Sequence, residues 1–291
     1  MIIRCWGTRG SIPVCGREYL TYGGSTTCME VQTGDDQVII LDAGTGIRKL
    51  GHTLLREKRR DLNIIFTHAH WDHLLGFPFF GPLYVAGTRI TAFGCPFAQN
   101  SIRAFLSPTM AAPNFPVDLT AVKATIEYRG ACAGEFQIGS VTVTPILLSH
   151  PNQGIGYRFS AGGRDFVFLT DNELGFRHPG GMLPDDYAKF ASGADLLVHD
   201  AEYRDDEYAA VKGWGHSTFQ DALKLAAAAG VKSLGMCHHN QERTDGGVDE
   251  MLASCRALAA GSATGSGVAT RAAVGAEFDI FSAAEGMEVE V

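Results

Sequence analysis

Three histidines and one aspartate lie within six positions of the sequence, in the stretch FTHAHWDHLLG at residues 66–76. Imidazole and carboxylate groups are costly to bury without a partner, yet this stretch follows LNIIF, which has the pattern of a buried strand. After a strand end, His68 and His70 can point to one side while Asp72 and His73 turn to the other. One loop with this spacing can therefore hold two neighbouring metal ions.

Later strand ends supply more groups of the same types. ILLSHPNQ places His150 after an apolar run, and FVFLTDNE places Asp171 after another. LGMCHHNQ offers His238 or His239 in the same way. Such a density of histidine and aspartate indicates a metal centre rather than separate core or surface histidines. Imidazole and carboxylate ligands suit two Zn²⁺ ions, and Mn²⁺ or Fe²⁺ are alternatives to Zn²⁺.

The composition is that of a globular protein with a sizeable core. The chain has 291 residues, of which 45% are hydrophobic and 19% charged, close to the average for such proteins. No run approaches the roughly 20 apolar residues of a membrane helix, and the opening MIIRCWGTRG lacks a secretory-signal pattern. No membrane partner is therefore expected. Seven cysteines, an odd number without CxxC pairs, predict reduced thiols in a cytoplasmic protein.

The charge balance bears on the partners of the chain. A net charge of −8 argues against a general nucleic-acid binder, which normally carries a basic face. The one basic cluster, REKRR at 56–60, is interpreted as the solvated end of a helix. Long nucleic acid is therefore not expected as a partner, and a homodimer is one of the assemblies that the sequence allows.

Strand signals dominate the first 170 residues, and helices follow or intervene. Short apolar runs between Gly and Asp turns predict strands near 1–6, 27–33, 37–42, 63–67, 88–93, 123–129, 141–148, 154–160 and 165–170. Helices are expected at 46–59, 184–192, 217–229 and 247–259. The third has an S-x-x-Q capping box from Ser217 to Gln220 and a C-cap at Gly230. Two β-sheets between helical layers, in one α/β domain spanning 1–291, would satisfy this order.

Residues 74–120 differ from the rest in composition. They hold seven of the seventeen phenylalanines and six prolines, namely Phe77, Phe79, Phe80, Phe93, Phe97, Phe105, Phe115, Pro78, Pro82, Pro96, Pro108, Pro113 and Pro116. One interpretation is an irregular segment packed on the core, since most phenylalanine is buried. The other is an apolar cover over the active site, with rings available to a flat substrate.

The run THAHWDH, with LDAGTG before it and the later single ligands, resembles the metallo-β-lactamase superfamily of binuclear hydrolases. The resemblance covers roughly residues 1 to 245 and implies an αββα four-layer sandwich with the metals where the two sheets meet. It implies two ligand sets that share Asp171, the first with His68, His70 and His150, and the second with Asp72, His73 and His238. The family pattern favours His238 over His239, and Asp42 of LDAG would support the site without binding metal.

Two further stretches narrow the resemblance to the tRNase Z and phosphodiesterase branch. LLVHDAEY at 196–203 and GWGHSTFQDAL at 213–223 resemble its H-E-A and G-H-S-T motifs, and GIGYRF and WGTRGSIP fit the same branch. The resemblance implies that His216 donates a proton to the leaving oxygen and that Asp200 orients it, although the family usually has glutamate there. The alternative for His216 is a histidine that only caps the following helix.

The expected function is therefore hydrolysis of a phosphodiester. Two metal ions would acidify a water and neutralise the phosphate oxygens, and Asp171 and Asp72 would fix the metal pair. Only twenty residues separate His150 from Asp171, too few for the long arm with which tRNase Z grips tRNA, so a small diester such as a cyclic nucleotide is favoured. The alternatives are an RNA or single-stranded DNA nuclease, with a basic groove leading to His216, and a non-hydrolytic di-iron redox module.

Overall fold

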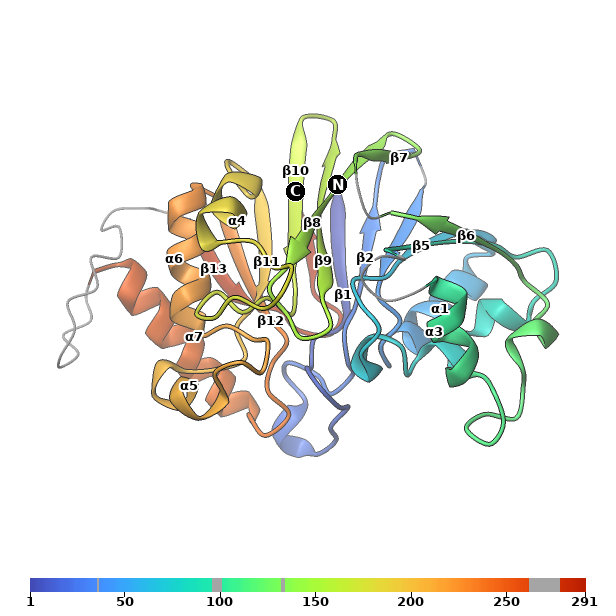
Figure 1. Cartoon of the computed structure of the whole chain (residues 1–291), viewed down its shortest axis with the longest axis horizontal. Helices are drawn as coiled ribbons and strands as arrows, with labels where there is room; N and C mark the ends of the chain where they lie inside the picture. Colours follow the sequence, from blue (N-terminus) through green and yellow to red (C-terminus); the bar gives the residue numbers. More distant parts are fainter. Residues whose placement is uncertain (36, 96–100, 132–133, 262–277) are drawn as a thin grey trace.

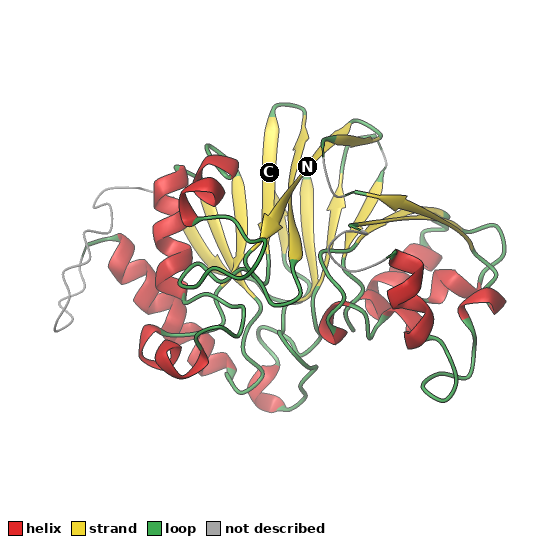
Figure 2. Ribbon diagram, in the orientation of Figure 1, coloured by secondary structure: helices red, strands yellow, loops and turns green. Residues whose placement is uncertain are grey.

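Two β-sheets stand face to face between two outer layers of helices (Figure 1, Figure 2). The computed structural model describes residues 1–35, 37–95, 101–131, 134–261 and 278–291. This arrangement confirms the αββα sandwich expected from the sequence. Within the described ranges, no helix combines the length and the apolar character needed to cross a bilayer.

Among the described residues, the first sheet has seven strands, and the half that ends at the edge strand β6 (Thr125–Gly130) is parallel. In spatial order the strands are β14 (Glu288–Glu290), β1 (Ile2–Gly7), β2 (Cys28–Gln32), β3 (Val38–Leu41), β4 (Asp61–Ile65), β5 (Arg89–Gly94) and β6. Strands β3 to β6 run parallel, whereas β14, β1, β2 and β3 pair antiparallel. All four residues of β3 are buried, as expected for a strand that is covered on both faces.

The second sheet also has seven strands. In spatial order they are β13 (Asp279–Ser282), β12 (Ser233–Cys237), β11 (Leu196–Asp200), β10 (Arg164–Leu169), β9 (Gly154–Ala161), β8 (Val141–Leu148) and β7 (Phe136–Ile138). Strands β10 to β13 are parallel, and β7 to β10 are antiparallel. The expected hairpin is confirmed, because β9 and β10 pair from Ala161 to Arg164 across Gly162 and Gly163, whose φ values are 60° and 75°.

Three apolar layers hold the sandwich together. Between the sheets, Ile3 and Leu41 pack in one cluster with Phe159 and Phe166 of the second sheet. Outside the first sheet lie α1 (Ile47–Arg56), α3 (Ile102–Thr109) and the short 3₁₀ helices η2 (Trp71–His73), η3 (Phe77–Phe79), η4 (Gly81–Tyr84) and η5 (Leu119–Ala121). Outside the second lie α4 (Pro184–Phe190), α6 (Phe219–Ala229) and α7 (Asp245–Ala259). In the described ranges, the remaining helices are η1 (Arg17–Tyr19) and α5 (Asp205–Val211).

The structure corrects several local expectations. The N-cap of α6 is Thr218, whose side chain accepts from the Asp221 backbone N–H, and not Ser217. The Ser217 hydroxyl instead donates to the Asn172 carbonyl at 2.6 Å, a tertiary contact that the capping pattern does not reveal. The C-cap at Gly230 is confirmed by its φ of 63°. Strands β7, β13 and β14 were not expected, because three or four residues give too short a pattern.

The segment 74–120 contains both core and exposed rings. Phe77 and Phe80 are fully buried in the cluster beneath α1 and η4, so for these rings the packing interpretation holds. Phe79, in contrast, is 57% exposed. Phe97 lies outside the described residues, and a covering role for the exposed part stays a prediction.

The cysteines only partly follow the sequence prediction. Free thiols are present at Cys5, Cys15, Cys28, Cys237 and Cys255. Cys95 is disulfide-bonded, so the expectation of reduced thiols throughout the chain is wrong at this position. A pattern of odd number and scattered spacing could not reveal it, because pairing depends on the folded distance between sulfur atoms.

The turn LDAG after β3 lies directly against the histidine-rich loop. The Ala43 N–H donates to the His73 carbonyl at 2.8 Å, and the Gly44 N–H donates to the Thr27 carbonyl at 3.0 Å. A Cβ on Gly44 would lie 2.3 Å from the Asp72 carbonyl oxygen and 2.5 Å from the Thr27 carbonyl oxygen. Only glycine lets these backbones approach so closely.

We therefore predict that Gly44→Ala lowers the free energy of unfolding by about 1–3 kcal/mol, the usual cost of overpacking. Chemical denaturation of the purified protein measures this change. Gly34→Ala is the matched control, because a Cβ there meets no atom within 4 Å. Equal stability of the two variants would contradict the close contact.

Candidate metal centre

The residues of the candidate site follow strand ends, and left-handed turns aim several of them. Asp42 follows β3, Asp171 comes two residues after β10, and His238 follows β12. Their φ values are 60°, 56° and 58°, a conformation that non-glycine residues rarely adopt. Such backbone conformations persist only where the surrounding structure imposes them, and they concentrate at functional sites.

Two groups of side chains have a geometry that can hold a metal ion. In each group the potential ligand atoms lie within 4.8 Å of one another. The first group contains His68, His70, His150 and Asp171, and the second contains Asp72, His73, Asp171 and His238. All seven residues that the sequence predicts as ligands are thus brought together, and Asp171 belongs to both groups.

A second partner fixes the orientation of most of these imidazole rings. The Nδ1 atom of His73 lies 2.8 Å from Asp42 Oδ2, that of His238 lies 2.9 Å from Glu202 Oε2, and that of His150 lies 2.8 Å from the Gly215 carbonyl. An Nδ1–H that donates outward leaves the Nε2 lone pair free for a metal. Asp42 thus supports His73 from behind, where the resemblance places it.

The His70 ring has the opposite orientation, with its Nδ1 atom rather than its Nε2 atom facing the other ligands of the first group. Its Nδ1 atom faces His150 Nε2 at 3.0 Å, and its Nε2 atom lies 3.3 Å from the Asn152 amide nitrogen. His70 therefore presents Nδ1, and His150 presents Nε2, to the first group.

Buried atoms without partners provide the test of whether a cation fits. His68 Nε2 and His73 Nε2 are inaccessible to solvent and have no hydrogen-bond partner among the described residues. A buried polar atom without a partner is costly in free energy. Both atoms point at Asp171, at 3.4 Å and 3.3 Å. A divalent cation would satisfy these nitrogen atoms and the carboxylate together, so the donor set fits.

The charge states of Asp171 and His150 agree with this fit. Burial opposes the charge of Asp171, but the nearby imidazoles of His238 and His73 hold the pKa of its carboxyl well below the usual range. Burial lowers the pKa of His150 to about 3, so this ring is neutral at neutral pH. A buried carboxylate and a neutral imidazole are the forms that ligate metals. Despite burial, the neighbouring carboxylates raise the pKa of His73 and His238 well above the usual range, so a bound cation would displace a proton from these two rings.

The structure distinguishes the two adjacent histidines. His238 Nε2 lies 3.1 Å from Asp72 Oδ2 within the second group. The His239 ring turns away, and its Nε2 atom donates to the Ala283 carbonyl at 2.8 Å. Of the two, only His238 belongs to a ligand group of the described residues.

His216 lies beside the second group, on the side of the second sheet. Its ring stacks on that of His238 with 4.5 Å between centroids. Its Nδ1 atom lies 3.2 Å from Asp200 Oδ2 and 3.5 Å from Glu202 Oε2. Burial alone lowers the pKa of His216, but the charge of Glu202 and the hydrogen bond to Asp200 raise it to about 9. The predicted pair of His216 and Asp200 is therefore in contact.

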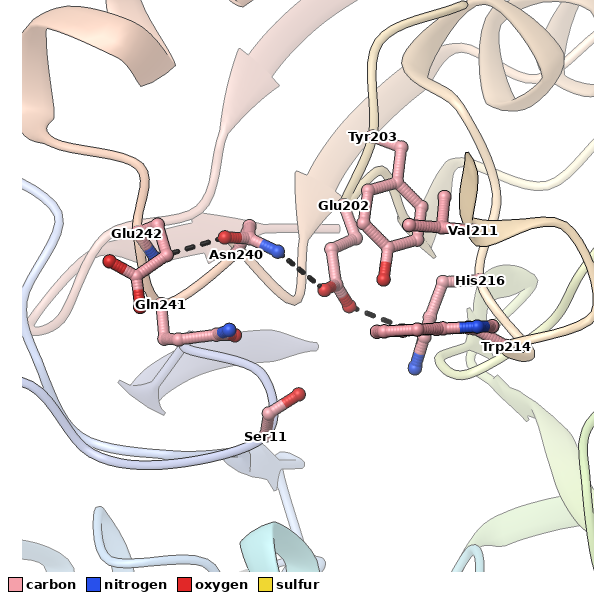
Figure 3. A pocket seen from close by; sticks show the side chains of 9 residues that line it. All are labelled: Ser11, Glu202, Tyr203, Val211, Trp214, His216, Asn240, Gln241 and Glu242. Carbon is pink, nitrogen blue, oxygen red and sulfur yellow. Dashed lines mark hydrogen bonds and ion pairs between the residues drawn. The ribbon is translucent and has the colours of Figure 1, made fainter. Parts of the chain in front are cut away.

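Glu202 is a component of the site that the sequence analysis missed. Its carboxylate lies between the Nδ1 atoms of His238 and His216. It also accepts from the Asn240 amide at 2.8 Å, and Figure 3 shows Glu202 between Asn240 and His216. Glu202, His216 and His238 form a third group of possible ligands, but hydrogen bonds already satisfy these atoms. The sequence could have indicated Glu202 through its position two residues after Asp200, because side chains two residues apart in an extended chain point to the same side.

The comparisons with known proteins agree with this geometry. The profile of the β-lactamase superfamily domain matches residues 37–239, which include every candidate ligand. The chain belongs to this superfamily.

Individual proteins show how far this similarity extends. Ribonuclease Z of Exiguobacterium sibiricum is 28% identical over 224 residues, which are 65% of this chain and 74% of that protein. The metallo-β-lactamase fold protein YhfI of Bacillus subtilis superposes with a TM-score of 0.69 at 17% identity, covering 100% of this chain and 98% of that one. A diphosphatase of the PhnP family superposes with a TM-score of 0.66 at 17% identity, covering 100% of this chain and 97% of that one. At such identities, the superpositions show the shared fold.

The superfamily assignment and the two ligand groups together make the protein a binuclear metal-dependent hydrolase. Its polar interior is correspondingly organised around the ligand groups. The carboxylates of Asp42, Asp200 and Glu202 are all buried next to histidines, and this keeps each ring in one orientation.

A second carboxylate missed by the sequence analysis, Glu173, holds the loop that carries His216. One oxygen accepts from the Tyr208 hydroxyl and the Gly213 N–H, both at 2.7 Å. The other accepts from the Gly215 N–H at 2.7 Å and pairs with His178 at 2.8 Å. The Gly215 carbonyl in turn accepts from His150, so Glu173 positions both His216 and the back of a candidate ligand.

We predict that His68→Ala and Asp72→Ala each lower the metal content of the protein by emptying different groups. Elemental analysis of metal-loaded protein measures the stoichiometry, which we expect to be two in the wild type. His52→Ala is the control, because His52 is exposed on α1. A wild-type protein that binds no more than one ion after loading would refute the paired site.

We also predict that Glu173→Gln destabilises the fold. The new amide would direct N–H donors at backbone N–H groups, and unsatisfied buried polar groups cost about 1–3 kcal/mol. Thermal or urea denaturation measures this loss. Glu127→Gln, on exposed β6, is the matched control and should change stability by less than about 0.5 kcal/mol. A similar small change in both variants would show that the Glu173 contacts contribute little.

Proposed function

We propose that the protein hydrolyses a phosphodiester, with two divalent metal ions in the adjoining groups and His216 as the proton donor. The observation that supports this proposal is the position of His216. Its ring stacks on the candidate ligand His238 and contacts the buried carboxylates of Asp200 and Glu202. A proton donor for the leaving oxygen is needed next to the metals, and this is the place for it.

The proposed ligands of one ion are His68, His70 and His150, those of the other are Asp72, His73 and His238, and Asp171 contributes to both. Zn²⁺ suits this set of imidazoles and carboxylates, and Mn²⁺ or Fe²⁺ would also be accepted. When bound, the ions would supply an acidified water and positive charge next to the phosphate oxygens. Asp171 and Asp72 would fix the spacing of the pair.

The protein residues would handle the proton. With Nδ1 turned toward Asp200 and Glu202, His216 keeps its Nε2 atom for the departing oxygen. The two carboxylates stabilise the imidazolium form before transfer and hold the ring in one orientation. Since Ser217 and Asn172 donate their backbone N–H groups to Asp200, at 2.9 Å each, the pair is rigid.

A pocket of about 310 Å³ lies beside His216 and would receive the leaving group (Figure 3). It is lined by Ser11, Glu202, Tyr203, Val211, Trp214, His216, Asn240, Gln241 and Glu242. This lining of described residues includes hydroxyl, amide and carboxylate groups but neither lysine nor arginine. Such a pocket favours a neutral leaving group with hydroxyls or amines, such as the nucleoside part of a small diester.

RNA is the second candidate substrate. The net charge of −8 argues against long nucleic acid as a partner. Relatives named Ribonuclease Z, one of them 28% identical to this chain, weaken this exclusion, and charge alone does not rule out RNA as a substrate. In contrast, the superfamily match and the contact between His216 and Asp200 both favour hydrolysis over the redox alternative.

Activity assays decide between the two substrates. The metal-loaded protein is incubated with bis-p-nitrophenyl phosphate, 2′,3′- and 3′,5′-cyclic nucleotides and a short RNA. We expect hydrolysis of the activated diester and of at least one cyclic nucleotide. Cleavage of RNA alone would favour the nuclease, and inactivity on every diester with two ions bound would refute the proposal.

His216→Ala should reduce kcat for nucleotide diesters by about 10²–10⁴-fold, the usual range for general acid catalysis. Nitrophenolate leaves without a proton, so hydrolysis of bis-p-nitrophenyl phosphate should be spared by comparison. Asp200→Asn should show a weaker form of the same asymmetry, and elemental analysis should find unchanged metal content in both variants. A uniform loss on both substrates would assign His216 to structure or metal binding instead.

A further inference from the structure

An apolar groove of about 410 Å³ borders the histidine-rich loop on the side of the first sheet. It is lined by Ala69, Trp71, Leu74, Leu75, Pro78, Phe79, Phe105, Pro108, Thr109, Asn114 and Phe115. None of these described lining residues has an ionisable side chain, and none also lines the pocket beside His216. The volume lies within the roughly 300–1,000 Å³ that small-molecule sites occupy.

Two of the rings in this groove are unusually open to solvent. Trp71 is 74% exposed and Phe79 is 57% exposed. Trp6, in contrast, is partly buried and donates to Glu30 Oε2 at 2.9 Å. Exposed apolar rings that gather in a concave site are a mark of ligand binding, whereas single exposed apolar residues are ordinary.

The other rings hold the groove in a preformed shape. Phe79 meets Phe115 edge to face, with 5.5 Å between centroids. Phe105 meets Phe66, which is buried in the core, at the same centroid distance of 5.5 Å. The Tyr84 hydroxyl donates to the Pro78 carbonyl. A ligand would therefore enter a rigid site and lose little affinity to reorganisation.

The groove and the candidate metal ligands belong to the same short stretch of chain. Ala69 and Trp71 line the groove, and they alternate along the sequence with His68, His70 and Asp72. A substituent carried on a phosphorus atom at the metal centre could therefore reach the groove. Because the leaving group is assigned to the pocket beside His216, the groove would receive the group that stays on phosphorus.

We propose that this groove is a substrate subsite for a flat, uncharged aromatic ring, of nucleobase size, which stacks on Trp71. The proposal rests on the proposed phosphodiesterase function and specifies which diesters the site prefers. Stacking suits any aromatic ring, because each presents a π-face, and the lack of ionisable side chains favours a ring without charge.

The test compares two esters that share a leaving group and a charge. Thymidine 5′-p-nitrophenyl phosphate carries a base on the retained side, whereas methyl p-nitrophenyl phosphate does not. For wild-type protein we expect a lower KM for the thymidine ester. Trp71→Ala should raise that KM about 5- to 150-fold, the range that corresponds to stacking on one base, and leave the KM of the methyl ester within about twofold.

Two further variants separate the ring from other effects. Trp71→Phe keeps an aromatic face and should restore most of the preference for the thymidine ester. Leu20→Ala is the matched control for loss of an exposed apolar side chain, since Leu20 is 78% exposed and lies outside the groove. It should change neither KM.

The outcomes distinguish this proposal from the function on which it rests. If wild type hydrolyses both esters and Trp71→Ala changes both KM values alike, the subsite is refuted and the diesterase function stands. If neither ester is hydrolysed with both ions bound, the two proposals fall together. If Trp71→Ala abolishes binding to phosphatidylcholine vesicles and leaves both KM values unchanged, the groove contacts lipid, and the subsite is again refuted.

Discussion

The buried carboxylate of Asp171 is the group around which the candidate centre is arranged. Its oxygens lie 3.4 Å from His68 Nε2, 3.3 Å from His73 Nε2, 3.7 Å from His150 Nε2 and 3.4 Å from His238 Nε2. The first two rings follow β4 of the first sheet, and the other two follow β8 and β12 of the second. The centre can exist only if the two sheets hold a fixed relative position, and the apolar cluster between them supplies that constraint.

Around Asp171, the interior polar groups form successive layers. Carboxylates orient the rings, and backbone N–H groups orient the carboxylates. Asp200 shows the principle, because it accepts from two backbone N–H groups and contacts His216. Buried charge is tolerable only with such complete hydrogen bonding. The loops at this edge of the sandwich are therefore held by polar contacts in addition to the apolar packing that stabilises the strands.

Much of this arrangement could be predicted from sequence, since it depends on local spacing. The histidine-rich loop follows a buried strand, the β9–β10 hairpin has its Gly-Gly turn, and α6 ends at Gly230. The order of strands and helices was compatible with two sheets between helical layers, and the resemblance to the metallo-β-lactamase superfamily implied the four-layer sandwich. The ligand roles and the covering role of 74–120 remain predictions.

What the sequence could not provide depends on contacts between distant segments. Glu202 and Glu173 each lie two residues after a predicted site residue, but their partners come from other loops. Ser217 has a good capping pattern, yet its hydroxyl is used by the loop at Asn172. Phe77 and Phe79 differ by two positions and by burial, with one ring in the core and one exposed. Periodicity within one segment does not carry that information.

The left-handed turns at Asp42, Asp171 and His238 also restrict which amino acids these positions accept. Asparagine, aspartate, histidine and glycine tolerate this conformation best, whereas β-branched side chains resist it. Ligand chemistry and backbone conformation therefore select overlapping sets of residues at the same sites. Most substitutions at these positions would therefore have two costs, the loss of the functional side chain and the strain of a left-handed backbone conformation. Asparagine at Asp171 would keep the shape and the conformational preference, but it would remove the charge and replace one acceptor oxygen with an N–H donor.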